Sequence, residues 1–209
     1  MSWILITIAW GLLGAGAGWV VRWGSMRLAL LEGLAPGNKP WQVFGPPILS
    51  AALFAAFAFT LGPFPPLLIR SVFSLVLVQV IFFDFEHRLI LDRVMFPSML
   101  VALIVSLFAN PWWAGIATAV GAGLVFLLLA LAGSALFKAE ALGFGDVKLA
   151  FFMGLLLGPL PTVQALFYGV FLAGLVSVGI IVWHRSLKGT IAYGPYLAAG
   201  ALIALFQLR

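Results

Sequence analysis

The sequence contains no cysteine, and charged side chains make up only 8% of its 209 residues. The missing cysteines exclude disulfide bonds, thiolate catalysis and any zinc site built on cysteine. A soluble domain of this size carries about a quarter charged residues, so the low charge and a mean hydropathy of +1.20 exclude an ordinary water-soluble fold. No charged segment precedes the first apolar run, and we therefore expect no cleaved signal peptide.

The chain consists largely of apolar runs separated by short polar, glycine or proline breaks. A membrane-spanning helix needs about 20 mostly apolar residues. The runs therefore predict an all-α, polytopic membrane helix bundle with about eight transmembrane helices, formed by residues 1–209 as a single membrane-embedded domain. A polar connection is expected at residues 22–45, between the first two spans. The expected spans are Trp3–Val21, Pro46–Leu61, Leu67–Phe83, Val94–Ala109, Trp113–Phe137, Val147–Leu157, Thr162–Trp183 and Thr190–Phe206.

Glycines mark two places where little side-chain volume is needed. The first span carries four glycines that predict a small-residue face for close helix contact; these are Gly11, Gly14, Gly16 and Gly18. Two more, Gly143 and Gly145, lie in the charged loop Lys138–Asp146, where we expect them to form turns.

The few charges are distributed unevenly over the predicted loops. A net charge of +5 and a pI near 10.1 occur in nucleic-acid-binding proteins, but here the basic residues stand singly between apolar runs, so we expect no nucleic-acid partner. Nine of the eleven basic residues fall in loops on one side of an eight-span bundle: Arg22, Arg27, Lys39, Arg88, Arg93, Lys138, Lys148, Arg185 and Lys188. An excess of Lys and Arg marks the cytoplasmic side, so both termini are predicted outside. Arg22, Arg185 and Lys188 are candidates for contact with anionic lipid.

The chain has three aspartates, which lie in two short charged stretches. Asp84 and Asp92 belong to residues 83–92, and Asp146 belongs to residues 143–149; the charge pattern places all three at the cytoplasmic side. If the third and sixth spans pack together, Asp84 and Asp146 meet at one depth. Two adjacent carboxyl groups share a proton, so that one can activate water while the other polarises a carbonyl. This is the chemistry of aspartic proteolysis, which needs no metal, serine or cysteine.

Simpler roles for the aspartates stay open. Aspartate is a preferred N-cap residue, and Asp146 and Asp92 each precede a predicted helix. Asp84 can pair with Arg88 at a helix end.

The residues around the aspartates have alternative roles as well. Glu86 and His87 are more typical of a solvated loop than of a site, and His87 with the nearby carboxylates lacks the spacing of a known metal site. Lys148 and Glu140 flank Asp146, where each either tunes the pKa of Asp146 or simply lies at the interface.

Three segments together carry a resemblance to a known family. Residues 83–92 read Phe-Asp-Phe-Glu-His-Arg-Leu-Ile-Leu-Asp, residues 143–149 read Gly-Phe-Gly-Asp-Val-Lys-Leu, and residues 193–198 read Tyr-Gly-Pro-Tyr-Leu-Ala. In this order they resemble the Ile-Asp, GxGDxKL and Phe-Gly-Pro-Tyr-Leu-Ala segments of the type IV prepilin peptidases, which are GxGD aspartic membrane proteases. Leu91 stands where that family usually has proline. The resemblance implies Asp84 and Asp146 as the catalytic pair and Asp92 as a supporting residue. We expect no metal, and the further candidate supporting residues around Asp146 are Lys148, Gly143, Gly145 and Glu140.

The resemblance also implies substrates and a location. It implies a multi-pass endopeptidase of the bacterial inner membrane that removes the short leader from type IV prepilins or pseudopilins at the cytoplasmic face. Its partners would be the prepilin or pseudopilin helix and the lipid bilayer. Many members also methylate the new N-terminus with S-adenosylmethionine, and these commonly carry zinc-binding CxxC motifs between the first two spans. This chain has no cysteine, so we expect no zinc, and S-adenosylmethionine only if methylation is retained.

Two other functions are alternatives to prepilin cleavage. A presenilin-like protease would carry a Pro-Ala-Leu motif in a late span, and the sequence has none. A proton-coupled small transporter or a scaffold would use the same aspartates to relay protons or cap helices. Transporters often consist of two similar halves, and the sequence shows no clear internal repeat.

Overall fold

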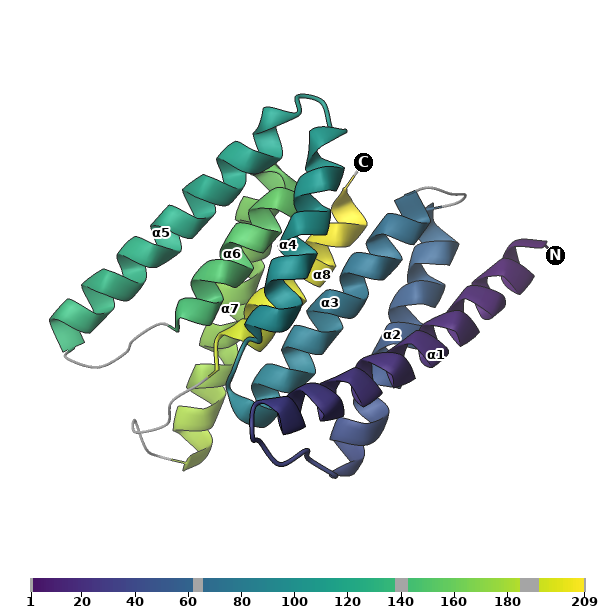
Figure 1. Ribbon diagram of the computed structural model, residues 1–209, viewed down its shortest axis with the longest axis horizontal. Coiled ribbons are helices and arrows are strands. Elements are labelled where there is room, and N and C mark those ends of the chain that lie inside the picture. Colours follow the sequence, from purple (N-terminus) through teal and green to yellow (C-terminus); the bar gives the residue numbers. More distant parts are fainter. Residues whose placement is uncertain (1, 62–65, 138–142, 185–191, 209) are drawn as a thin grey trace. The chain divides into compact units, whose positions relative to one another are not determined.

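The computed structural model describes residues 2–61, 66–137, 143–184 and 192–208, and these residues form eight α-helices with no β-strand among them (Figure 1). This confirms the predicted all-α fold. The chain folds into two compact units, Met1–Arg88 and Leu89–Arg209. The expected single domain over residues 1–209 stays a prediction.

The first unit consists of three long helices. They are α1 (Ser2–Leu31), α2 (Pro40–Leu61) and α3 (Pro66–His87). Helices α1 and α2 pack along each other most extensively, and α3 contacts both of them. The polar connection is shorter than expected, because residues 22–31 extend α1 and residues 40–45 open α2. Pro40 begins α2, where a missing N–H costs nothing, and the helix continues through Pro46 and Pro47.

The contact between α1 and α2 depends on three glycines rather than the expected four. A Cβ atom on Gly14 would lie 2.6 Å from the Ser50 carbonyl oxygen, and one on Gly18 would lie 2.6 Å from that of Pro46. Gly11 faces Ala55 less tightly. Gly16 faces open space, since it lies on another side of the helix from the other three. The small-residue face is therefore Gly11, Gly14 and Gly18.

The second unit is organised around a short helix with neighbours on several sides. Its helices are α4 (Asp92–Leu107), α5 (Trp113–Phe137), α6 (Phe144–Leu157), α7 (Pro159–His184) and α8 (Gly194–Gln207). Helix α6 contacts all four of the others and is largely buried. Gly158, with φ of +71°, ends α6 directly after the predicted Leu157, but α7 begins at Pro159 rather than at the predicted Thr162. The predicted fifth span coincides with α5.

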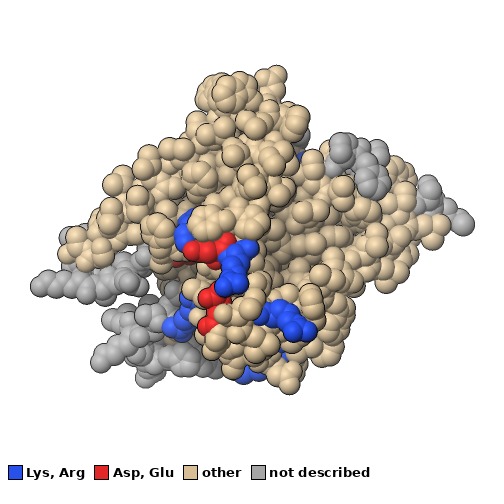
Figure 2. Space-filling model, in the orientation of Figure 1, with Lys and Arg blue, Asp and Glu red and all other residues tan. Residues whose placement is uncertain are grey.

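Length separates the helices into two groups. Among the described residues, α1, α2, α3, α5 and α7 are long and apolar enough to cross a membrane, whereas α4, α6 and α8 have 16, 14 and 14 residues. Most of the face shown in Figure 2 carries no charged side chain. The structure thus agrees with a multi-pass membrane protein. The count of eight crossings and the position of both termini outside stay predictions.

Candidate active site

Asp84 lies in the last turn of α3 and is 5% exposed. The helix continues to His87, and Arg88 then leaves it with φ of +54°, a left-handed conformation that commonly ends helices. The expectation that Glu86 and His87 lie in a loop is therefore wrong, because residues 85–87 are helical. Asp84 is consequently held by a formed helix rather than by a loop.

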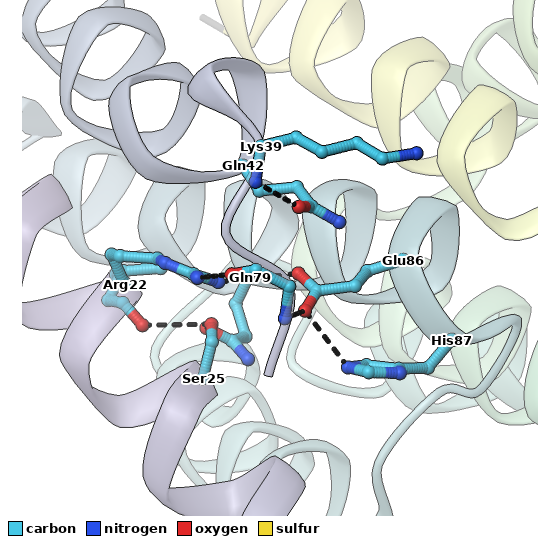
Figure 3. A network of polar contacts seen from close by, with 9 residues as sticks. Arg22, Ser25, Lys39, Gln42, Gln79, Glu86 and His87 are labelled. Atoms are coloured by element: carbon cyan, nitrogen blue, oxygen red, sulfur yellow. Dashed lines mark hydrogen bonds and ion pairs between the residues drawn. The ribbon is translucent and has the colours of Figure 1, made fainter. Parts of the chain in front are cut away.

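Glu86 is not the solvated loop residue that the sequence indicated. Its carboxylate is buried and lies 3.3 Å from an Arg22 guanidinium nitrogen. The backbone N–H of Gly37 donates to the same carboxylate, and Arg22 donates to the Gly37 carbonyl (Figure 3). His87 Nε2 lies 3.2 Å from Glu86 as well. A carboxylate can be buried when opposite charge and hydrogen bonds compensate its lost hydration, and no local sequence pattern reveals partners 49 and 64 residues away.

The predicted position of Arg22 is likewise wrong. It was expected at the membrane surface as a candidate for lipid contact, but it is 4% exposed and pairs with Glu86 inside the first unit. A nearby polar contact joins the same helices, because the Ser25 hydroxyl donates to Gln79 Oε1 at 2.7 Å. These residues were missed because single polar side chains within apolar runs carry no local signal.

Asp146 lies in the first turn of α6 and is 8% exposed. The N-cap of α6 is Gly143, so the interpretation of Asp146 as a cap is wrong; the cap of α4 is likewise Leu91, not Asp92. Asp146 lies outside the five long apolar helices. Burial raises its pKa to about 6, while a hydrogen bond from the Gly143 backbone acts in the opposite direction. A fraction of this carboxyl group therefore keeps its proton near neutral pH.

The two glycines of the GxGD segment do not form the expected turns. Gly145 is helical, and Gly143 has an extended backbone with φ of −71° and ψ of 146°. A Cβ atom on Gly145 would lie 2.9 Å from the Cβ of Ile90. Gly145 therefore allows the start of α6 to pack closely against the segment that precedes α4.

Lys148 and Asp92 form an ion pair between α6 and α4, with an N–O distance of 2.5 Å. The Lys148 ammonium also lies 5.4 Å from the ring centre of Phe96 and 5.1 Å from that of Phe144. These two rings and Lys148 border a pocket of about 420 Å³ between α4, α5 and α6. Asp92 thus joins the start of α4 to the start of α6, and its supporting role in the reaction stays a prediction.

The structure places the predicted site residues in two groups. Asp92, Gly143, Gly145, Asp146 and Lys148 lie together in the second unit. Asp84 belongs to the first unit, so its pairing with Asp146 stays a prediction. Four basic or acidic residues of the sequence analysis lie outside the described residues: Lys138, Glu140, Arg185 and Lys188. Within the described part of the chain, no three His, Asp or Glu side chains come together in a group that would hold a metal ion.

Comparison with known proteins decides the family. The sequence model of the type IV leader peptidase family matches residues 71–178, half of the chain, including all three aspartates. The chain belongs to the type IV leader peptidase family. This confirms the resemblance to the prepilin peptidases, with residues 83–92 and 143–149 inside the match and residues 193–198 outside it, and it favours a peptidase over the transporter alternative.

Individual proteins are also similar to this chain. A prepilin leader peptidase/N-methyltransferase of Bacillus subtilis (strain 168) is 29% identical over 161 residues, covering 75% of this chain and 62% of the relative. The protein of the same name from Aeromonas hydrophila is 32% identical over 162 residues, covering 76% of this chain and 56% of the relative. This family member thus spans less than two thirds of the length of these relatives. No solved structure matches the chain.

Proposed function

We propose that the protein is a membrane aspartic endopeptidase that removes the leader from type IV prepilins or pseudopilins. The observation that supports this most directly is the family match over residues 71–178, a region that contains one buried aspartate at the end of α3 and another at the start of α6. The substrate class follows from the names of the relatives, prepilin leader peptidase/N-methyltransferase.

The proposed mechanism uses Asp84 and Asp146 as one catalytic pair. Two adjacent carboxyl groups hold a single proton between them. Burial favours the protonated form of Asp146, so Asp146 would donate a hydrogen bond to the scissile carbonyl. Asp84, ionised, would take a proton from the attacking water, and that proton then passes to the leaving amine.

We further propose that cleavage occurs at the cytoplasmic face of the bacterial inner membrane. Nine of the eleven basic residues lie in predicted loops of one side, and such an excess marks the cytoplasm. All three aspartates are adjacent to loops of this side. The same pattern puts both chain termini on the opposite side.

Processing of a purified prepilin tests the activity directly. We expect a prepilin incubated with the protein in detergent or nanodiscs to lose its leader, leaving a new N-terminus at the boundary of its apolar helix. Intact-mass and N-terminal mass spectrometry report the cut position. An unprocessed prepilin, with the protein shown to be folded, would contradict the proposed peptidase.

The same mass measurement decides whether the new terminus is methylated. We propose cleavage without zinc, because the chain has no cysteine. A product mass raised by one methyl group only when S-adenosylmethionine is added would show that methyl transfer is retained.

The rate of leader cleavage should fall as the pH rises above about 6. Burial, partly offset by the Gly143 hydrogen bond, puts the pKa of Asp146 near this value, and a second carboxylate beside it would raise the pKa further. Raising the pH removes the proton that the pair shares, so activity is lost through an alkaline limb with a midpoint above about 6. Initial cleavage rates measured between about pH 5 and about pH 9 check this. A rate that is level over that range would contradict the assignment.

A further inference from the structure

Each of the two proposed catalytic aspartates is followed, two positions later, by a charged residue. Glu86 follows Asp84 near the end of α3, and Lys148 follows Asp146 near the start of α6. Residues two apart on an α-helix point in directions about 200° apart, because the helix has 3.6 residues per turn. Each charged residue therefore lies on the opposite face of its helix from the aspartate.

In the first unit, Glu86 closes a ring of interactions with Arg22 and Gly37, which we call the Glu86 ring. Arg22 contributes the counter-charge from α1, and Gly37 contributes both its N–H and its carbonyl from the connection between α1 and α2 (Figure 3). The Arg22 and Glu86 side chains are 5% and 7% exposed. The ring fixes the end of α3 against α1 and against the connection.

In the second unit, Lys148 performs the corresponding role with Asp92, and we call these two residues the Lys148 pair. The pair joins the start of the second turn of α6 to the first residue of α4. The rings of Phe96 and Phe144 lie beside the ammonium and limit its movement. The close approach of Gly145 to Ile90 sets the spacing of the same two segments.

The Glu86 ring and the Lys148 pair share their geometry, but the residue two positions after the aspartate is acidic in the first and basic in the second. Each of them fixes the helix face that lies opposite the aspartate, through an ion pair within its own unit.

We propose that Glu86 and Lys148 are positioning residues, each of which fixes the helix end that carries one catalytic aspartate through an ion pair with Arg22 or Asp92. This inference rests on the proposed peptidase function. It implies that each aspartate is oriented by contacts within its own unit and does not depend on the other unit for its orientation.

The Lys148 pair offers the sharper test, because Asp92 is half exposed. Removing the Lys148 ammonium therefore leaves no deeply buried charge behind. Lys148→Met should lower the kcat of prepilin cleavage on the order of 10²-fold, as expected for a misplacement of about 1 Å. KM and the midpoint of the alkaline limb should stay at the wild-type values. Lys148→Arg and the charge-exchanged double variant Asp92→Lys/Lys148→Asp should recover most of the rate. Lys39→Met is the matched control, since it removes an exposed lysine from the first unit.

Hydrogen exchange gives a readout that does not depend on activity. Lys148→Met should speed amide exchange in the second turn of α6, where the N–H groups are the first ones bonded within the helix, and Glu86→Gln should do so at the end of α3 and in residues 32–39. Lys39→Met should leave exchange in α6 and at the end of α3 unchanged. Unchanged exchange in Lys148→Met would overturn the proposal whatever the cleavage rates are. The proposal would also be overturned by a wild-type kcat in Lys148→Met, by a shifted midpoint of the alkaline limb in that variant, or by a charge-exchanged double variant that recovers none of the rate. If the wild-type protein cleaves no prepilin, the proposed function fails, and hydrogen exchange still decides the role of the ion pairs.

Discussion

Asp84→Asn and Asp146→Asn should each lower the rate of leader cleavage by about 10²–10⁴-fold, the usual contribution of a positioned acid or base. Asparagine has nearly the same shape as aspartate, so the buried helix ends keep their packing. It can neither take a proton from water nor share one with a second carboxylate. Each variant therefore removes the chemistry while leaving the fold in place.

The double variant gives a further result that only a catalytic pair predicts. Groups that act as a unit lose most of their effect when either one is removed. The Asp84→Asn/Asp146→Asn protein should thus be about as slow as either single variant, as measured by leader removal from a co-expressed prepilin on gels and by mass spectrometry. Glu32→Gln, which changes an exposed carboxylate to an amide, serves as the control. Undiminished cleavage in both single variants would show that the assigned mechanism is wrong.

Gly154→Ala should destabilise the second unit and slow cleavage together. A Cβ atom at Gly154 would lie 2.5 Å from the Ala119 backbone nitrogen and 2.8 Å from the Thr118 carbonyl carbon. These are backbone atoms of α5, so the helices themselves must separate. Overpacking of this kind typically costs about 1–3 kcal/mol, and a shift of about 1 Å at Asp146 would lower the rate on the order of 10²-fold.

The control for this substitution lies on the neighbouring helix. Gly121 is on α5 and faces open space, so Gly121→Ala adds the same methyl group without a clash. Thermal unfolding in detergent should show a lower midpoint for Gly154→Ala and an unchanged or higher one for Gly121→Ala. Equal midpoints and equal cleavage rates for the two variants would refute the argument from close α5–α6 packing.

Local patterns were sufficient to predict the helices but not all of their ends. The apolar runs predicted α5 completely and α3 up to Asp84, because apolar length alone determines such segments. Arg22 was taken as the end of the first span, since a lone charge normally marks a membrane boundary. Its partner Glu86 is 64 residues away, and only the folded chain reveals that the charge is compensated and that α1 continues.

The candidate site was predicted from motifs, and its supporting contacts were only partly visible. Asp84 and Asp146 were found because aspartates are rare in this chain and occur in recognisable segments. The role of Gly145 was misassigned, because a glycine needed for close packing against Ile90 looks the same in sequence as a glycine that forms a turn. The ion pair of Lys148 with Asp92 joins residues 56 apart, a relationship that sequence spacing does not show.

The short length of α6 has a consequence for how solvent reaches the reaction. A helix of 14 residues is about 21 Å long, whereas the hydrocarbon layer is roughly 30 Å thick. At least one end of such a helix lies below the lipid headgroups, where its free amide or carbonyl groups need hydration or other polar partners. Hydrolysis requires a water molecule at the same depth as the carboxyl groups. A short helix packed against the longer α5 and α7 would therefore leave room for water to reach the depth of Asp146 from one side of the bilayer.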